Sequence, residues 1–135
     1  MSRLSTIRIL LFAAAVPLLL RFVGIDRVQR WLEPSTPPRI PRPGRKAAED
    51  LVRRIDSVLR LGWPFIRRGC LVRGLTVYRF LREAGFRVAL CFGMGRPDGV
   101  EDFTGHCWVE LEGQALAEKQ EPRPIYTETF RIRSA

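Results

Sequence analysis

At 135 residues the chain is long enough for one domain at most, with part of its length outside the core. Its composition is globular, because 46% of the residues are hydrophobic and 27% are charged. A net charge of +9, from 23 Lys and Arg against 14 Asp and Glu, favours an acidic partner such as a nucleic acid, an anionic lipid surface or an acidic peptide. The arginines are spread along the whole chain and no nucleic-acid-binding motif accompanies them, so we expect no nucleic-acid partner.

The cysteine content argues against both a disulfide framework and a metal site. Cys70, Cys91 and Cys107 are an odd number of cysteines, and none of them forms a C-x-x-C pair. With a single histidine in the chain, a zinc site would need most of these residues at once. We therefore expect reduced thiols, a cytoplasmic setting, and neither a metal nor a cofactor.

Residues 1–32 form an apolar to amphipathic segment that we expect to be helical. The uncharged run 9–20 is shorter than the roughly 20 apolar residues that span a membrane, and no small-x-small cleavage site follows it. Arg27, Arg30 and Leu32 belong to an amphipathic extension of this run. Two interpretations have equal weight, contact with a membrane surface and packing on the domain or on a partner subunit, and a true membrane span is the third.

The folded domain is expected to begin after a proline-rich linker. Residues 33–46 contain five prolines, at positions 34, 37, 38, 41 and 43, which favour an extended chain over a helix. From residue 47 the pattern becomes helical, and Leu51, Ile55 and Leu59 share one face. We therefore assign residues 33–46 to a linker and 47–135 to the domain.

A second helix and several strands follow along the chain. Residues 70–84 have helical periodicity, and Gly85 is expected to end this helix as a C-terminal cap. Beyond it the strand candidates are 86–94, 103–113, a short segment after Gly113, and 125–132. No crossover helix separates these strands, so we predict an α+β fold with helices packed on one side of an antiparallel sheet.

Successive side chains of the expected strand 103–113 point alternately to its two faces. Cys107, Val109 and Leu111 should point toward the apolar side, whereas His106, Trp108 and Glu110 should point toward a polar side. Cys107, like Cys91 in the preceding strand, is best explained as a small buried hydrophobic residue.

Cys70 lies in a different setting from the other two cysteines. It follows Gly69, Arg68 and Arg67 and stands at the start of a helix. An ordinary cysteine, with a pKa of about 8.5, is only a few per cent thiolate at neutral pH, and a helix N-terminus, nearby cations and an imidazolium lower that pKa. The same helix end offers unpaired N–H groups to an oxyanion, so Cys70 is the candidate nucleophile and His106 its candidate partner.

A nucleophile–histidine pair usually has a third member that orients the ring. Glu110 lies on the strand of His106 and shares its face, whereas Glu118 lies on the following segment, where a neighbouring strand could return alongside. A carboxylate across a ladder meets a ring more easily than one two residues along the same strand. We therefore favour Glu118 and keep Glu110 as the alternative.

The segments CLVRGLTVYRFLREAGF and FTGHCWVELEG, with the strand between them, resemble the lasso-peptide biosynthesis B2 proteins. These are leader peptidases with a transglutaminase-like fold, a minimal papain-like core. The resemblance covers residues 63–130, and the chain departs from the family pattern with Gly74 in place of Ser, Cys107 in place of Ala, and Glu118 in place of Asp. The matching positions are Cys70, Leu71, Arg73, Leu75, Tyr78, Leu81, Gly85, His106, Trp108, Val109, Glu110 and Gly113.

The resemblance implies a specific activity and specific partners. Cys70 would be the nucleophile, His106 the general acid and base, and Glu118 the orienting acid of a cysteine peptidase. Its substrate would be the leader of a ribosomally made precursor peptide, held by a separate B1-type recognition protein before a lasso cyclase closes the ring. The alternatives are a transglutaminase-like acyltransferase and a non-catalytic, membrane-associated peptide-binding module.

Overall fold

The computed structural model describes residues 3–23, 27, 30, 32, 44–62, 70–96, 101–102, 104–118, 122 and 125–133. The side chains of residues 3–5 and of Cys70 lie outside this description. The description also leaves out most of the expected linker, and the two arginines and the glycine that precede Cys70.

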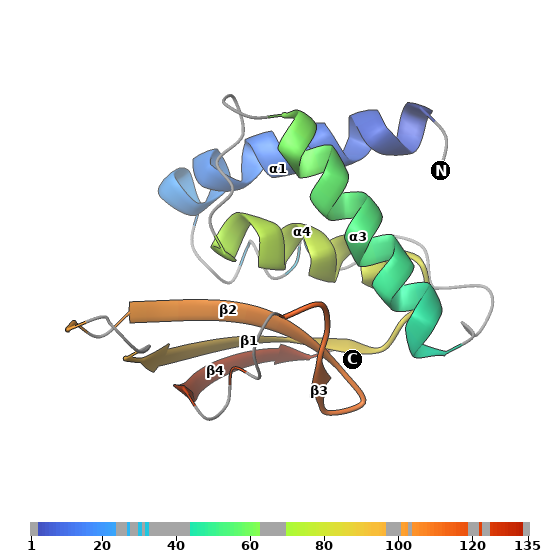
Figure 1. Cartoon of the computed structure of the whole chain (residues 1–135). Helices are drawn as coiled ribbons and strands as arrows, with labels where there is room; N and C mark the ends of the chain where they lie inside the picture. Colours follow the sequence, from blue (N-terminus) through green and yellow to red (C-terminus); the bar gives the residue numbers. More distant parts are fainter. Residues whose placement is uncertain are drawn as a thin grey trace.

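The described part of the chain forms three helices and a four-stranded sheet in the predicted order. The helices lie on one face of the sheet, whose strands follow the order β3-β2-β1-β4 and are all antiparallel (Figure 1). The α+β prediction is therefore confirmed. The elements are α1 (Arg3–Phe22), α3 (Arg45–Leu61), α4 (Cys70–Glu83), β1 (Val88–Gly95), β2 (Thr104–Leu111), β3 (Gln114–Ala115) and β4 (Tyr126–Arg133).

The apolar N-terminal helix α1 packs against α3 and α4 (Figure 1). Ile9, Ala13 and Val16 are buried on this side, and the ring of Phe12 meets that of Phe80 edge to face at a centroid distance of 5.7 Å. Of the interpretations of this segment, packing on the domain is the one that the structure displays. Within the described ranges, no helix has the length and apolar character needed to cross a bilayer.

Helix α3 lies across α4 and begins already at Arg45, inside the segment expected to be linker. Arg45 can enter the helix because the prolines end at position 43. The buried stripe includes Ile55 and Leu59 as predicted, whereas Leu51 lies at its edge, partly buried. The fully covered positions of the helix are Ala48, Val52, Ile55, Val58 and Leu59.

Helix α4 is the central helix, because it packs on β1 and β2 on one side and on α1 and α3 on the other. Its end is set by Gly85, whose φ of 99° places it in the left-handed region that favours glycine. The N–H of Gly85 donates to the carbonyl of Arg82 at 3.0 Å, and that of Phe86 donates to the carbonyl of Leu81 at 3.0 Å. This pair of bonds is a Schellman motif, and the predicted cap is confirmed.

The face of β2 that was expected to be polar is instead covered. Trp108 is 0% exposed and Glu110 is 2% exposed, so both sides of the second half of this strand are buried. The Trp108 Nε1–H donates to Glu110 at 3.0 Å, and Arg131 of β4 donates to the other Glu110 oxygen at 3.1 Å. Alternation identified the two faces, but burial of the second depends on contacts such as that of Arg131 from another strand, which alternation does not reveal.

Candidate active site

Cys70 is the first residue of α4, so its backbone stands where a helix has unpaired N–H groups. One turn later, Gly74 rests directly on β2, since a Cβ added there would lie 2.5 Å from the Cys107 sulfur. Figure 1 shows α4 and β2 running in the same direction, so α4 begins over the beginning of β2. The start of the helix and the part of β2 that carries His106 therefore belong to the same end of the domain.

The His106 ring belongs to a cluster of three aromatic rings, in which the other two, Trp108 and Tyr126, lie 6.4 Å apart. It stacks on Tyr126 at a centroid distance of 4.9 Å and on Trp108 at 5.8 Å. Gly93, opposite His106 in the ladder, packs closely under this cluster, because a Cβ there would lie 3.0 Å from the Trp108 ring, which is tighter than an ordinary contact. The His106 side chain is 25% exposed, so these contacts restrict its orientation while part of the side chain stays open to solvent.

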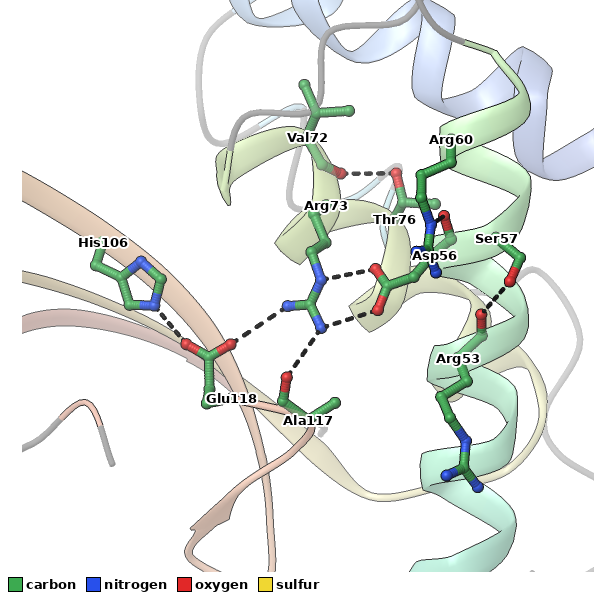
Figure 2. Close-up of polar contacts among 10 residues, drawn as sticks. All are labelled: Arg53, Asp56, Ser57, Arg60, Val72, Arg73, Thr76, His106, Ala117 and Glu118. Atoms are coloured by element: carbon green, nitrogen blue, oxygen red, sulfur yellow. Dashed lines mark hydrogen bonds and ion pairs between the residues drawn. The ribbon is translucent and has the colours of Figure 1, made fainter. Parts of the chain in front are cut away.

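Glu118 contacts this histidine directly, through its Oε1 and the Nε2 of His106 (Figure 2). The chain reaches this position by turning back at Glu112 and Gly113 and running antiparallel to β2 through β3. Just beyond β3, the N–H of Leu116 donates to the carbonyl of Val109 at 2.8 Å. Among the described residues, the polar contact of the ring is thus made through Nε2, which leaves Nδ1 for proton exchange. The two side chains expected to interact are in contact, and their catalytic roles remain predictions.

Glu110, the alternative third residue, is directed elsewhere. Its carboxylate oxygens accept from Trp108 and Arg131, as described above, and it is buried within the sheet. Within the described part of the chain, the carboxylate that contacts His106 belongs to Glu118. The geometry therefore favours Glu118 over Glu110 as the residue that orients the ring.

Two further residues complete this polar arrangement, and sequence reasoning did not assign them a role. The Arg73 guanidinium of α4 lies 3.4 Å from Glu118 Oε2, on the side of the carboxylate opposite His106 (Figure 2). Asp56 of α3 accepts from Arg73 Nε at 2.7 Å. Arg73 was one of the positions that matched the family motif, whereas the sequence contains no signal for Asp56, because the contact joins separate elements.

A family model of the transglutaminase-like superfamily matches residues 10–131 of the chain. The chain belongs to the transglutaminase-like superfamily. This superfamily includes cysteine peptidases and acyltransferases, and its fold is generally that of a catalytic, cysteine-protease-like domain. No curated protein and no solved structure gives a significant match.

The matched range begins at residue 10, inside α1, and ends at residue 131, inside β4. Most of α1 therefore belongs to the transglutaminase-like domain. Cys70, His106 and Glu118 all fall inside the matched range. Among the residues that the structure describes, no group of three His, Cys, Asp or Glu side chains is arranged to hold a metal ion.

The two other cysteines of this transglutaminase-like domain are poor candidates for nucleophiles. Cys91 is 0% exposed, and burial, with a further effect of the Glu110 carboxylate, raises the pKa of its thiol to about 12. Cys107 is 3% exposed beneath α4. Both therefore fit the prediction that they are small buried residues, and Cys70 remains the candidate nucleophile.

Proposed function

We propose that this protein is a cysteine peptidase that removes the leader from a ribosomally made lasso precursor peptide. The observation that carries the proposal is the contact between His106 and Glu118 at the end of the domain where α4 begins with Cys70. A nucleophile at a helix N-terminus, a histidine and an orienting carboxylate are the three parts that acyl transfer through a thiolate needs.

The proposed reaction begins when the Cys70 thiol gives its proton to Nδ1 of His106. The thiolate attacks the carbonyl carbon of the scissile peptide bond, and the carbonyl electron pair moves to oxygen. Backbone N–H groups in the first turn of α4 stabilise the resulting oxyanion. As the carbonyl re-forms, the C–N bond breaks and the leaving amine takes the proton from His106.

Water completes the proposed cycle. It gives a proton to Nδ1 of His106 while its oxygen attacks the thioester carbon, and collapse of this second intermediate breaks the C–S bond. The products are a peptide with a new carboxyl terminus and the regenerated Cys70 thiol, which recovers the proton. Throughout, Glu118 accepts the hydrogen bond from Nε2–H and stabilises the positive charge that the ring carries between proton transfers.

The choice of substrate rests on the resemblance to the lasso-peptide B2 proteins. The motif residues around Cys70 and His106, CLVR and GHCWVE, support it, together with membership of a superfamily that contains cysteine peptidases. The proposed partners are the precursor peptide, a B1-type recognition protein that holds the leader, and the cyclase that receives the cleaved core. We propose a cytoplasmic location, where the precursor is made.

The test is to incubate the purified protein with a precursor peptide and its recognition protein in water enriched in oxygen-18, followed by mass spectrometry. We expect a leader fragment with one heavy oxygen in its new carboxyl group. Cys70→Ala should lower the rate roughly 10⁴-fold or more, whereas Cys91→Ala, the matched control at a buried thiol, should leave cleavage intact.

Two results would contradict the proposal. Cleavage by Cys70→Ala at the parent rate would exclude the thiolate mechanism. An unlabelled product joined to an added amine would identify an acyltransferase, because the acyl group would then have left the enzyme on nitrogen instead of water.

A further inference from the structure

The guanidinium of Arg73 connects three elements that meet at the candidate site. Arg73 belongs to α4, Asp56 to α3, and Glu118 to the connection that follows β3 (Figure 2). The three side chains are 22%, 27% and 13% exposed, so water reaches them only in part. An ion network in this position can determine how the connection after β3 lies against β2.

The two oxygens of Glu118 have different partners. Oε1 contacts the imidazole of His106, and Oε2 lies 3.4 Å from an Arg73 terminal nitrogen. A carboxylate held at both oxygens cannot rotate about its last bond without losing one partner. Arg73 therefore restricts the direction from which Glu118 meets the ring.

Arg73 also contacts the backbone of the same segment. Its second terminal nitrogen lies 3.5 Å from the carbonyl oxygen of Ala117. Ala117 has a φ of 53°, in the left-handed region that non-glycine residues seldom adopt. One guanidinium thus contacts both the backbone turn that brings Glu118 to the site and the carboxylate itself.

Asp56 in turn fixes the guanidinium. Its Oδ1 accepts from Arg73 Nε at 2.7 Å, and its Oδ2 lies 3.3 Å from the nitrogen that also approaches Ala117. This two-point contact matches the planar fork of arginine and would not be reproduced by the point charge of a lysine. The remaining nitrogen is then directed toward Glu118.

We propose that Arg73 is a positioning residue for the catalytic histidine, acting through Glu118 and held in turn by Asp56 of α3. This inference rests on the proposed function, since it assumes that His106 exchanges protons with Cys70. In this scheme Arg73 acts on the His106 ring only through the carboxylate of Glu118. Its effect should therefore appear in the rate of the chemical step and not in substrate binding.

The first test measures the rate at which Cys70 is alkylated by iodoacetamide, together with kcat and KM on a precursor peptide. Arg73→Gln should lower kcat about 10- to 100-fold, as expected when a catalytic group is displaced by a fraction of an ångström to about 1 Å, and should leave KM unchanged. It should also slow the alkylation of Cys70. Arg73→Lys should recover part of the loss, because it keeps the charge but not the fork.

The matched control is Arg79→Gln. Arg79 lies on the same helix, has 16% side-chain exposure and pairs with Glu83 at 3.4 Å, the distance that separates Arg73 from Glu118. A general loss of α4 stability would affect both variants alike. We expect Arg79→Gln to keep the parent alkylation rate and kcat.

A double-mutant cycle isolates the route of the effect. If Arg73 acts through Glu118, Arg73→Gln should add little further loss of the alkylation rate in a Glu118→Gln background. Independent losses that multiply would overturn the inference. If Arg73→Gln does not fold, as judged by circular dichroism, Asp56→Asn in the same cycle provides the equivalent test on the far side of the guanidinium.

The readouts separate the two proposals. A parent protein that cleaves its precursor, with Arg73→Gln at the parent kcat and alkylation rate, overturns only the positioning role. A parent Cys70 that reacts no faster with iodoacetamide than an unfolded cysteine overturns the proposed function, and the positioning role with it.

Discussion

The contact between Gly74 and Cys107 leads to a quantitative prediction about how α4 packs on β2. A Cβ added to Gly74 would lie 2.5 Å from the Cys107 sulfur and 3.2 Å from Leu90 Cδ1. The first distance is about 1 Å shorter than an ordinary contact between heavy atoms, which is roughly 3.5–4.0 Å. Gly74→Ala therefore forces α4 away from β2 or moves the sulfur.

The expected magnitude combines two opposing effects. Overpacking a core costs about 1–3 kcal/mol, whereas Gly to Ala inside a helix contributes about 1 kcal/mol of stability, so Gly74→Ala should lower the free energy of unfolding by about 0–2 kcal/mol. Cys107→Ala removes one buried heavy atom and should cost about 1 kcal/mol. In the double variant the new Cβ occupies the space vacated by the sulfur, and the stability should return to the parent value or exceed it.

The assay is equilibrium unfolding in urea for the parent, both single variants and the double variant. We expect a favourable coupling of about 2 kcal/mol between the two sites. Additive effects would refute the reasoning, because they would mean that Gly74 and Cys107 do not share the same space. The lasso-peptide B2 pattern that the sequence resembles has Ser and Ala at these two positions, and the contact between Gly74 and Cys107 would make the two differences one exchange of volume.

Three further predictions follow from the contacts of other residues. Glu118→Gln should reduce kcat/KM on a precursor, and Glu118→Asp should reduce it less. Glu110→Gln should instead lower the melting temperature, with a smaller effect on kcat/KM. A large loss of kcat/KM in Glu110→Gln alone would mean that Glu110, and not Glu118, orients the ring. Because the pKa of Cys91 is raised to about 12, its thiol should remain unmodified by iodoacetamide at pH 8 in the folded protein and react only in denaturant; modification without unfolding would contradict its burial. The Arg8 hydrogen bonds lower the pKa of Glu83, so this pair contributes stability above the ordinary carboxyl pKa that is lost as pH falls through the folded value. Arg8→Gln should therefore cost less than about 1 kcal/mol at pH 7 for a partly exposed pair. The cost should be smaller at a pH where Glu83 is protonated, because only the contact of the guanidinium with the Phe80 ring then remains to be lost, as measured by unfolding at both pH values.

The spacing of apolar residues and the positions of glycine and proline were sufficient to predict the order of elements and the fold class. The helix that starts at Cys70 and ends before Gly85 follows from apolar spacing and one glycine, and both depend on neighbours close in sequence. The approach of Glu118 to His106 could also be predicted, because a short strand after a tight turn returns the chain alongside β2.

The parts that could not be predicted depend on contacts between distant segments. Asp56 meets Arg73 only because α3 lies across α4, and nothing in the local sequence of either helix indicates the angle between them. In the same way, burial of Glu110 depends on Arg131, a residue of β4 that pairs with β1 and not with β2. Alternation assigns a side chain to a face but does not say what covers that face.

The burial of α4 on both sides has a mechanical consequence. This helix lies between the sheet and α1, with Leu75, Tyr78 and Leu81 at 0% exposure, so packing on both sides fixes the position of its backbone. Glu118, by contrast, stands on a connection after a strand of only two residues and is fixed mainly by side-chain contacts. The candidate site thus joins a helix that is packed on both sides to a connection that is fixed mainly by side-chain contacts. Substitutions at residues 116–118 and their partners should therefore change the orientation of His106 without disturbing the packing of α4.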